Sequence, residues 1–253
     1  MKADEFLEKA RRPSPLVEGL ILRGHTVILG GFWGSSKSWF AEALAVSVAA
    51  GVPFLDRQVT QGPVMIIDED SPQDILAERI TRLGKGIGKE AGELPITIHC
   101  QGGFKLSSTR AVDMVQKEIE SNAISLVVVD SLSSILGTLS ENDMTEARQR
   151  WSKLKGEKGT ATLFMIHHFG KVGEDLKEVG FTKALRGSTK LADSADTAFS
   201  IQGKAWPRII KVEKQRHSLA TEEFAIELEE DDQKTWARLK QVPLLRNWIG
   251  CKN

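Results

Sequence analysis

The hydrophobic and polar positions of this chain alternate in blocks that predict short buried strands separated by helices. Mainly apolar runs of this kind are typical of strands covered on both faces of a parallel sheet. The runs are HTVILG (25–30), PVMIID (63–68), ITIHC (96–100), ISLVVVD (124–130) and ATLFMIHH (161–168). The segments between them have helical spacing, and most of these end at a glycine: 36–51, 71–86, 109–121 and 145–159. Strands that alternate with helices predict an α/β fold with a mostly parallel central sheet flanked by helices.

The C-terminal part of the chain has a different pattern. From Asp196 onward, strand-like runs follow one another with few helical segments between them, at 197–202, 208–215, 222–230 and 234–241. We expect antiparallel strands that extend the central sheet. Because no repeat or low-complexity linker divides the sequence, we predict a single domain over 1–253, with an N-terminal segment (1–20) and a C-terminal tail (240–253).

Composition limits the classes of function. Hydrophobic residues make up 41% and charged residues 27%, as in ordinary globular proteins, and no apolar run is long enough to span a bilayer. The N-terminus does not resemble a secretory signal, and the two distant cysteines favour a reducing compartment, so we expect a cytoplasmic protein without a membrane partner. Basic and acidic residues balance at 34 each, which removes overall charge as an argument for nucleic-acid binding.

The first candidate site is the glycine-rich stretch GGFWGSSKSW (30–39), between a predicted strand and a predicted helix. Backbone N–H groups in such a loop form a cradle for phosphates, the lysine reaches the outer phosphates and the next hydroxyl holds Mg²⁺. Ser36 stands where the motif has its second glycine, and a positive φ there would cost about 1 kcal/mol. The alternative is a glycine-rich turn that binds no nucleotide. The candidate ATP-binding residues are Gly31, Gly34, Ser35, Ser36, Lys37, Ser38 and Trp39.

Acidic residues end two of the predicted strands. Asp130 closes LVVVD, at the sheet edge where a carboxylate supports Mg²⁺ together with Ser38. In the cluster DED (68–70), Glu69 is our candidate for orienting and deprotonating the attacking water. Asp70 would cap the following helix or support the metal, and the alternative for the whole cluster is helix capping alone.

Histidines and basic residues complete the candidate site. His167, or its neighbour His168, ends a strand where a polar side chain can sense the γ-phosphate, and the alternative is an ordinary strand-end histidine. Arg186, in ALRGST, and the pair Lys214 and Arg216, in VEKQRHS, are candidates for a cation that stabilises the transferred phosphoryl group from a neighbouring subunit.

In their order and spacing, these motifs resemble the RecA-like branch of P-loop ATPases, most closely the plasmid RepA-type hexameric replicative helicases. The resemblance is carried by 15–39, VMIIDEDSP (64–72), LVVVDSL (126–132), MIHHFGK (165–171), ALRGSTKLADSAD (184–196) and VEKQRHS (212–218). It implies that Glu69 is the catalytic glutamate, that Asp130 is the Walker B aspartate and that Arg186 reaches into the next subunit's site.

The resemblance implies an ATP-hydrolysing motor or switch that uses ATP and Mg²⁺ and acts on DNA in replication or recombination. It implies a homo-oligomer, a hexameric ring or a filament, with single-stranded DNA against loops near 133–145 and 170–183. Lys171, Lys177 and Lys183 are the candidate DNA contacts.

Two other functions remain open. One is a regulatory or adaptor module that binds nucleotide and hydrolyses little of it because of Ser36. The other, a small-molecule phosphotransferase, is disfavoured because no arginine-rich lid is evident between the later helices.

Overall fold

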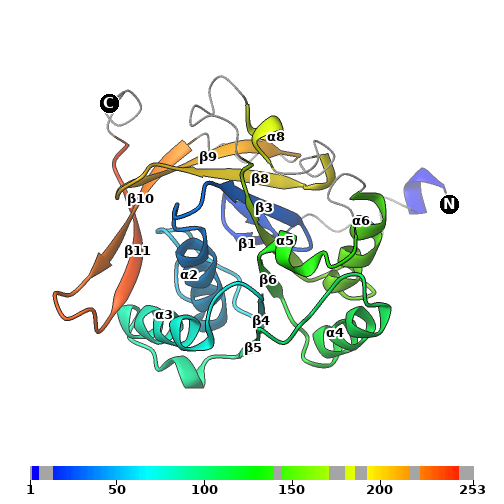
Figure 1. The fold of residues 1–253 in the computed structure, drawn as a ribbon, viewed down its shortest axis with the longest axis horizontal. Helices are drawn as coiled ribbons and strands as arrows, with labels where there is room; N and C mark the ends of the chain where they lie inside the picture. The colour runs from blue at the N-terminus through cyan, green and yellow to red at the C-terminus, as the bar shows by residue number, and fades with distance from the viewer. Residues whose placement is uncertain are drawn as a thin grey trace.

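The computed structural model describes residues 2–5, 14–139, 144–170, 180–185, 193–216 and 223–244. Within them a nine-stranded sheet runs in the order β11-β10-β9-β8-β3-β7-β6-β4-β5, beside a small hairpin, β1-β2 (Figure 1). The strands are β1 (Pro15–Val17), β2 (Ile21–Leu22), β3 (Thr26–Gly31), β4 (Val64–Asp68), β5 (Ile96–Cys100), β6 (Leu126–Asp130), β7 (Thr162–His168), β8 (Thr197–Gln202), β9 (Arg208–Gln215), β10 (Glu223–Glu230) and β11 (Ala237–Val242). The α-helices are α2 (Lys37–Ala50), α3 (Gln73–Gly86), α4 (Thr109–Ser121), α5 (Leu132–Ile135), α6 (Met144–Ser152) and α8 (Phe181–Ala184).

The predicted α/β architecture is confirmed. Each of the five apolar runs forms a parallel strand, and the four helical segments become α2, α3, α4 and α6. One detail differs, because β8 pairs with β3 in parallel and antiparallel pairing begins only at β9. The chain reaches β8 from β7 through a long connection, which permits parallel pairing, whereas a short hairpin joins β8 to β9. The small β1-β2 hairpin and the short helices α5 and α8 were not predicted.

Helices cover both faces of the sheet (Figure 1). One hydrophobic cluster joins α2, α3 and the β1-β2 hairpin to one face, and a second joins α4, α5 and α6 to the other. Side chains of β6 alternate between the clusters, with Val128 in the first and Val127 and Val129 in the second. This burial on both faces explains why the strands are apolar throughout, and among the described residues no helix is long and apolar enough to cross a membrane.

Helix α2 is central to the first cluster because it is apolar nearly all round, with most of its residues buried. It ends at Gly51, whose left-handed backbone (φ 69°) lets its N–H bond the carbonyls of Ser47 and Val48. The start of α2 follows directly from the loop after β3, so the core fixes that loop against the edge of the sheet.

Helix α3 packs against β11, and its last residue, Gly86, lies directly against the backbone of Ala237. A Cβ on Gly86 would overlap the carbonyl oxygen of Ala237, so we expect Gly86→Ala to lower the free energy of unfolding by about 1 to 3 kcal/mol. Gly92→Ala is the control, since a Cβ there meets nothing within 4 Å, and its effect should stay within about 0.5 kcal/mol. Urea denaturation measures both; equal stabilities would contradict the packing of α3 on β11.

Candidate nucleotide site

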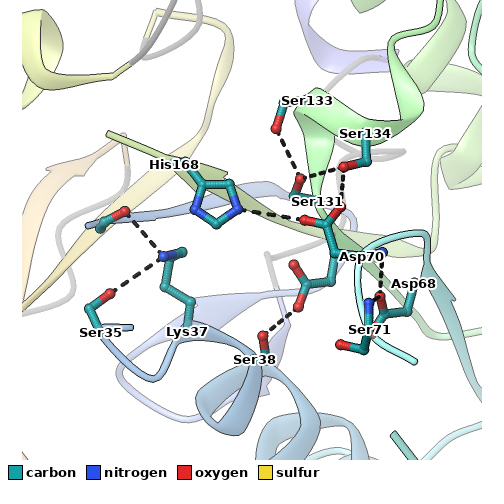
Figure 2. Close-up of polar contacts among 12 residues, drawn as sticks. Ser35, Lys37, Ser38, Asp68, Asp70, Ser71, Ser131, Ser133, Ser134 and His168 are labelled. Carbon is teal, nitrogen blue, oxygen red and sulfur yellow. Dashed lines mark hydrogen bonds and ion pairs between the residues drawn. The ribbon is translucent and has the colours of Figure 1, made fainter. Parts of the chain in front are cut away.

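The register of the parallel strands brings the candidate residues to one edge of the sheet. Gly31 of β3 lies opposite His168 of β7, and Asp68 of β4 lies opposite Asp130 of β6. Parallel strands end on the same side, so the loop between β3 and α2 and the strand-end acids meet there. Figure 2 shows this group, with the Ser38 side chain directed toward the acids and the Lys37 ammonium directed toward its own loop.

Lys37 is folded into its own loop. Its ammonium donates to the carbonyl oxygens of Gly31 (3.1 Å) and Phe32 (2.8 Å) and lies 3.5 Å from Ser35 Oγ. Burial lowers the pKa of Lys37 to about 8, against the opposing influence of the Asp130 and Asp70 charges. The direct partners of the Lys37 ammonium are therefore uncharged carbonyl and hydroxyl oxygens. A buried positive charge with uncharged partners favours the binding of a phosphate.

Ser36 adopts the left-handed conformation that the motif's missing glycine would adopt. Its φ is 69° and its ψ is 28°, and its side chain makes no capping hydrogen bond as α2 begins. The expected positive φ is therefore present, with a strain of about 1 kcal/mol. Gly34 also has a positive φ (74°), and a Cβ on Gly31 would come within 2.6 Å of Ser35 Oγ, so the backbone conformation favours glycine at the first position and close packing favours it at the second.

Ser38 and Asp130 form a pair suited to Mg²⁺. The Ser38 hydroxyl donates to Asp130 Oδ2 at 2.6 Å. Burial, followed by the charge of Asp68, raises the pKa of Asp130 to about 6, as expected for a carboxylate that is removed from water beside another acid. The described residues contain no group of three or more His, Cys, Asp or Glu side chains arranged for a metal. Mg²⁺ at phosphate sites needs only one or two protein oxygens beside phosphate and water, so this pair fits it.

The other strand-end acids have distinct partners. Asp68 Oδ1 accepts the N–H groups of Asp70 (2.8 Å) and Ser71 (2.7 Å), which closes the turn after β4. Asp70 does not cap α3, whose N-cap is Pro72 without a side-chain bond. The carboxylate of Glu69 accepts N–H groups from Gly103 (3.1 Å) and Phe104 (2.8 Å), in the loop after β5.

Asp70 instead belongs to a polar network with His168 and the serines that follow β6 (Figure 2). Its Oδ2 lies 3.5 Å from His168 Nε2, and Ser134 Oγ donates to its Oδ1. Ser131 Oγ lies 3.1 Å from Ser134 Oγ. The hydrogen bond with His168, more than any other contact, lowers the pKa of Asp70 to about 2. Of the two candidate histidines, His168 thus contacts the acids, whereas the adjacent His167 is buried beside Gly30 and points to the opposite face of β7.

Two residues near the site were not predicted from the sequence. Arg208, at the start of β9, is 5% exposed and donates to the carbonyl oxygen of Gly34 (3.0 Å), so it supports the tip of the loop. A single arginine at a strand end carries no sequence signal for this role. Glu42 is buried in α2, four residues after Ser38, and it pairs with Arg79 of α3 at 3.1 Å. An acid inside the apolar run WFAEALAV was the signal that could have identified it.

The remaining candidate residues lie away from the group at the sheet edge, or outside the residues that the structure describes. The ring of Trp39 is turned toward α3, with the guanidinium carbons of Arg79 and Arg82 at 5.7 and 5.2 Å from its centroid. Lys214 Nζ and Arg216 Nη2 donate to the carbonyl oxygen of Asp193 within the same chain. Arg186, Lys171, Lys177 and the side chain of Lys183 lie outside the described residues.

Comparison with known proteins identifies a family. The sequence model of the family described as "AAA domain" matches residues 1–174, the segment that contains the loop, the acids of β4 and β6, and both histidines. No curated protein matches the chain.

The strain at Ser36 predicts a gain from glycine. Because the Ser36 side chain makes no cap bond, Ser36→Gly should raise the free energy of unfolding by about 1 kcal/mol. Ser36→Ala is the control, since alanine keeps the Cβ and the left-handed strain. Urea denaturation compares the two variants with wild type; a glycine variant no more stable than the alanine variant would contradict the strain.

The burial of Glu42 predicts a pH dependence of stability. Burial raises its pKa to about 8 in the folded chain. The folded state therefore retains a proton that the unfolded chain has lost above about pH 4.3, and stability falls as pH rises toward 8, by at most about 1.4 kcal/mol per pH unit. Glu42→Gln cannot ionise, so its stability relative to wild type should increase from pH 5 to pH 8.

Denaturation midpoints at several pH values measure this difference. Glu78→Gln is the matched control, because Glu78 has a side chain 57% exposed on α3, and its difference from wild type should stay small and constant. A difference for Glu42→Gln that does not change with pH would show that Glu42 stays ionised beside Arg79.

Proposed function

The chain belongs to the AAA domain family of P-loop ATPases, and from this premise we propose that it is an ATP-hydrolysing motor or switch of the RecA-like type that acts on DNA. The observation that carries the hydrolytic part is the Ser38 hydroxyl 2.6 Å from Asp130 Oδ2, at the N-terminus of α2 and beside Lys37. This set of a loop, an ammonium, a hydroxyl and a strand-end acid is what Mg-ATP requires.

Each residue has a role in the proposed reaction. The backbone N–H groups of the loop and the first turn of α2 bind the phosphates of ATP. Lys37 exchanges the carbonyls of Gly31 and Phe32 for outer-phosphate oxygens, a favourable exchange because the phosphate oxygens carry full charge. Ser38 and Asp130 would hold Mg²⁺, which supplies positive charge to the β- and γ-phosphates when bound. Arg208 keeps the loop tip in place through Gly34.

The DNA-directed and oligomeric parts of the proposal rest on the resemblance to RepA-type helicases. Arg186 would reach the phosphates of a neighbouring subunit in a ring or filament, with Lys214 and Arg216 as further candidates. The loops after β6 and β7, with Lys171, Lys177 and Lys183, would contact single-stranded DNA.

A regulatory or adaptor module that binds ATP and hydrolyses little of it is the second candidate. The strained Ser36 favours it, because this departure lies in the loop that holds the phosphates. The two candidate functions predict different rates of ATP hydrolysis. They also differ in whether DNA increases that rate.

The test is an ATPase assay with and without single-stranded DNA, beside light scattering with a non-hydrolysable ATP analogue. We expect turnover that DNA stimulates and a nucleotide-dependent oligomer. Lys37→Ala should reduce turnover at least about 100-fold, because it removes a charge that stabilises the transition state. Background turnover that DNA does not change, from a monomer that still binds nucleotide, would favour the adaptor and contradict the motor.

A further inference from the structure

The carboxylate of Asp70 connects two loops at the edge of the sheet, the end of β7 through His168 and the start of α5 through Ser134 (Figure 2). We propose that Asp70 is a positioning residue, which holds the ring of His168 toward the outer phosphates so that His168 distinguishes ATP from ADP. This inference rests on the proposed binding of ATP and deepens it. Glu69 remains the candidate for orienting the attacking water.

His168 lies at the end of the loop where the outer phosphates would bind. Its backbone is opposite Gly31 in the register of β3 and β7. The carbonyl oxygen of Gly31 accepts the ammonium of Lys37 at 3.1 Å, and in a phosphate loop this ammonium is the group that reaches the outer phosphates. The side chain of His168 is 31% exposed, so a phosphate can reach it, whereas His167 is buried.

One nitrogen of the His168 ring is engaged by Asp70. Asp70 Oδ2 lies 3.5 Å from His168 Nε2, and this contact is the main cause that lowers the pKa of Asp70 to about 2. The carboxylate is therefore ionised at neutral pH, and it can only accept a proton that the ring carries on Nε2. Nδ1 is then the nitrogen that faces a phosphate. A ring between Asp70 and a phosphate donates to both anions as imidazolium, in which both nitrogens are donors.

The carboxylate of Asp70 is itself held through its other oxygen. Ser134 Oγ donates to Oδ1, and the hydroxyl of the buried Ser131 lies 3.1 Å from Ser134 Oγ. The backbone N–H of Asp70 donates to Asp68 Oδ1 at 2.8 Å, so the turn that carries the side chain is fixed as well. A carboxylate fixed at its backbone and at one oxygen keeps the direction that a positioning residue requires.

The charge of Asp70 separates a positioning role from simple repulsion. Asp70 lies close enough to Lys37 for its charge to act on the ammonium. By repulsion alone, an acid near the phosphates weakens the binding of ATP more than that of ADP, because ATP carries the larger negative charge. Removal of the acid would then increase the preference for ATP. In a positioning role, removal of the acid decreases this preference, because His168 is released from the γ-phosphate.

Asp70→Asn, His168→Gln and the double variant test this role. The measurement is the ratio of the dissociation constant of ADP to that of a non-hydrolysable ATP analogue, by isothermal titration calorimetry with Mg²⁺. We expect each single substitution to lower this ratio about tenfold, the loss expected for one hydrogen bond to a charged group. The double variant should show no further loss, because both side chains act through one contact. Asp70→Ser, which keeps a small polar side chain, repeats the test.

The chain offers a matched control in the pair of His99 and Glu118. His99 Nε2 lies 2.9 Å from Glu118 Oε2, and the side chains are 35% and 32% exposed, against 31% and 34% in the pair that contains Asp70. This control pair joins β5 to α4, and three strands separate β5 from β3 in the sheet. Glu118→Gln should therefore leave the ratio at the wild-type value, and melting temperatures compare the stability of all the variants.

The outcomes are distinct. A ratio that rises in Asp70→Asn shows that Asp70 acts by repulsion and overturns the proposal. An unchanged ratio, losses that add in the double variant, or an equal loss in Glu118→Gln overturns it as well. A wild-type protein that binds neither nucleotide rejects the proposed ATPase function itself. A wild type that binds and hydrolyses ATP, together with an unchanged ratio in Asp70→Asn, rejects only the role of Asp70.

Discussion

The in-register parallel pairing of β3, β7, β6 and β4 is the constraint on which the candidate site depends. It sets Gly31 opposite His168 and Asp68 opposite Asp130, although these residues are far apart in the sequence. A slip of one residue would turn the strand-end side chains to the other face of the sheet. The apolar clusters on both faces fix the register of the strands. The packing of the core therefore also determines the geometry of the site.

The same packing places several ionisable side chains in buried, poorly hydrated positions. Burial raises the pKa values of Asp130 and Glu42 and lowers that of Lys37, each a sign that the ionised form is held at a cost. Asp70 is the exception, because its contact with His168 lowers its pKa. An arrangement of this kind is unfavourable for the isolated chain and becomes favourable when a cation and an anion bind beside it, which is typical of functional sites.

The sequence predicted the fold well because its strands are buried on both faces and therefore apolar throughout. It also predicted the edge where the site lies, since parallel strands share that edge. It did not predict side-chain directions. His167 and His168 differ by one position, and only the register of β7 decides which of them meets Asp70. The contact of Arg208 with Gly34 depends on a strand that follows the loop by more than 170 residues, and no local pattern encodes it.

Ser36 departs from the loop motif without changing the path of the loop. It takes the left-handed conformation that glycine would take, and α2 begins normally after it, with the N–H of Phe40 bonded to the Ser36 carbonyl at 3.2 Å. The N–H groups that would bind phosphate belong to this backbone, so the substitution affects the stability of the loop more than its shape. The acidic side of the site, where Asp130 and the residues after β4 lie, supplies the other groups on which turnover depends.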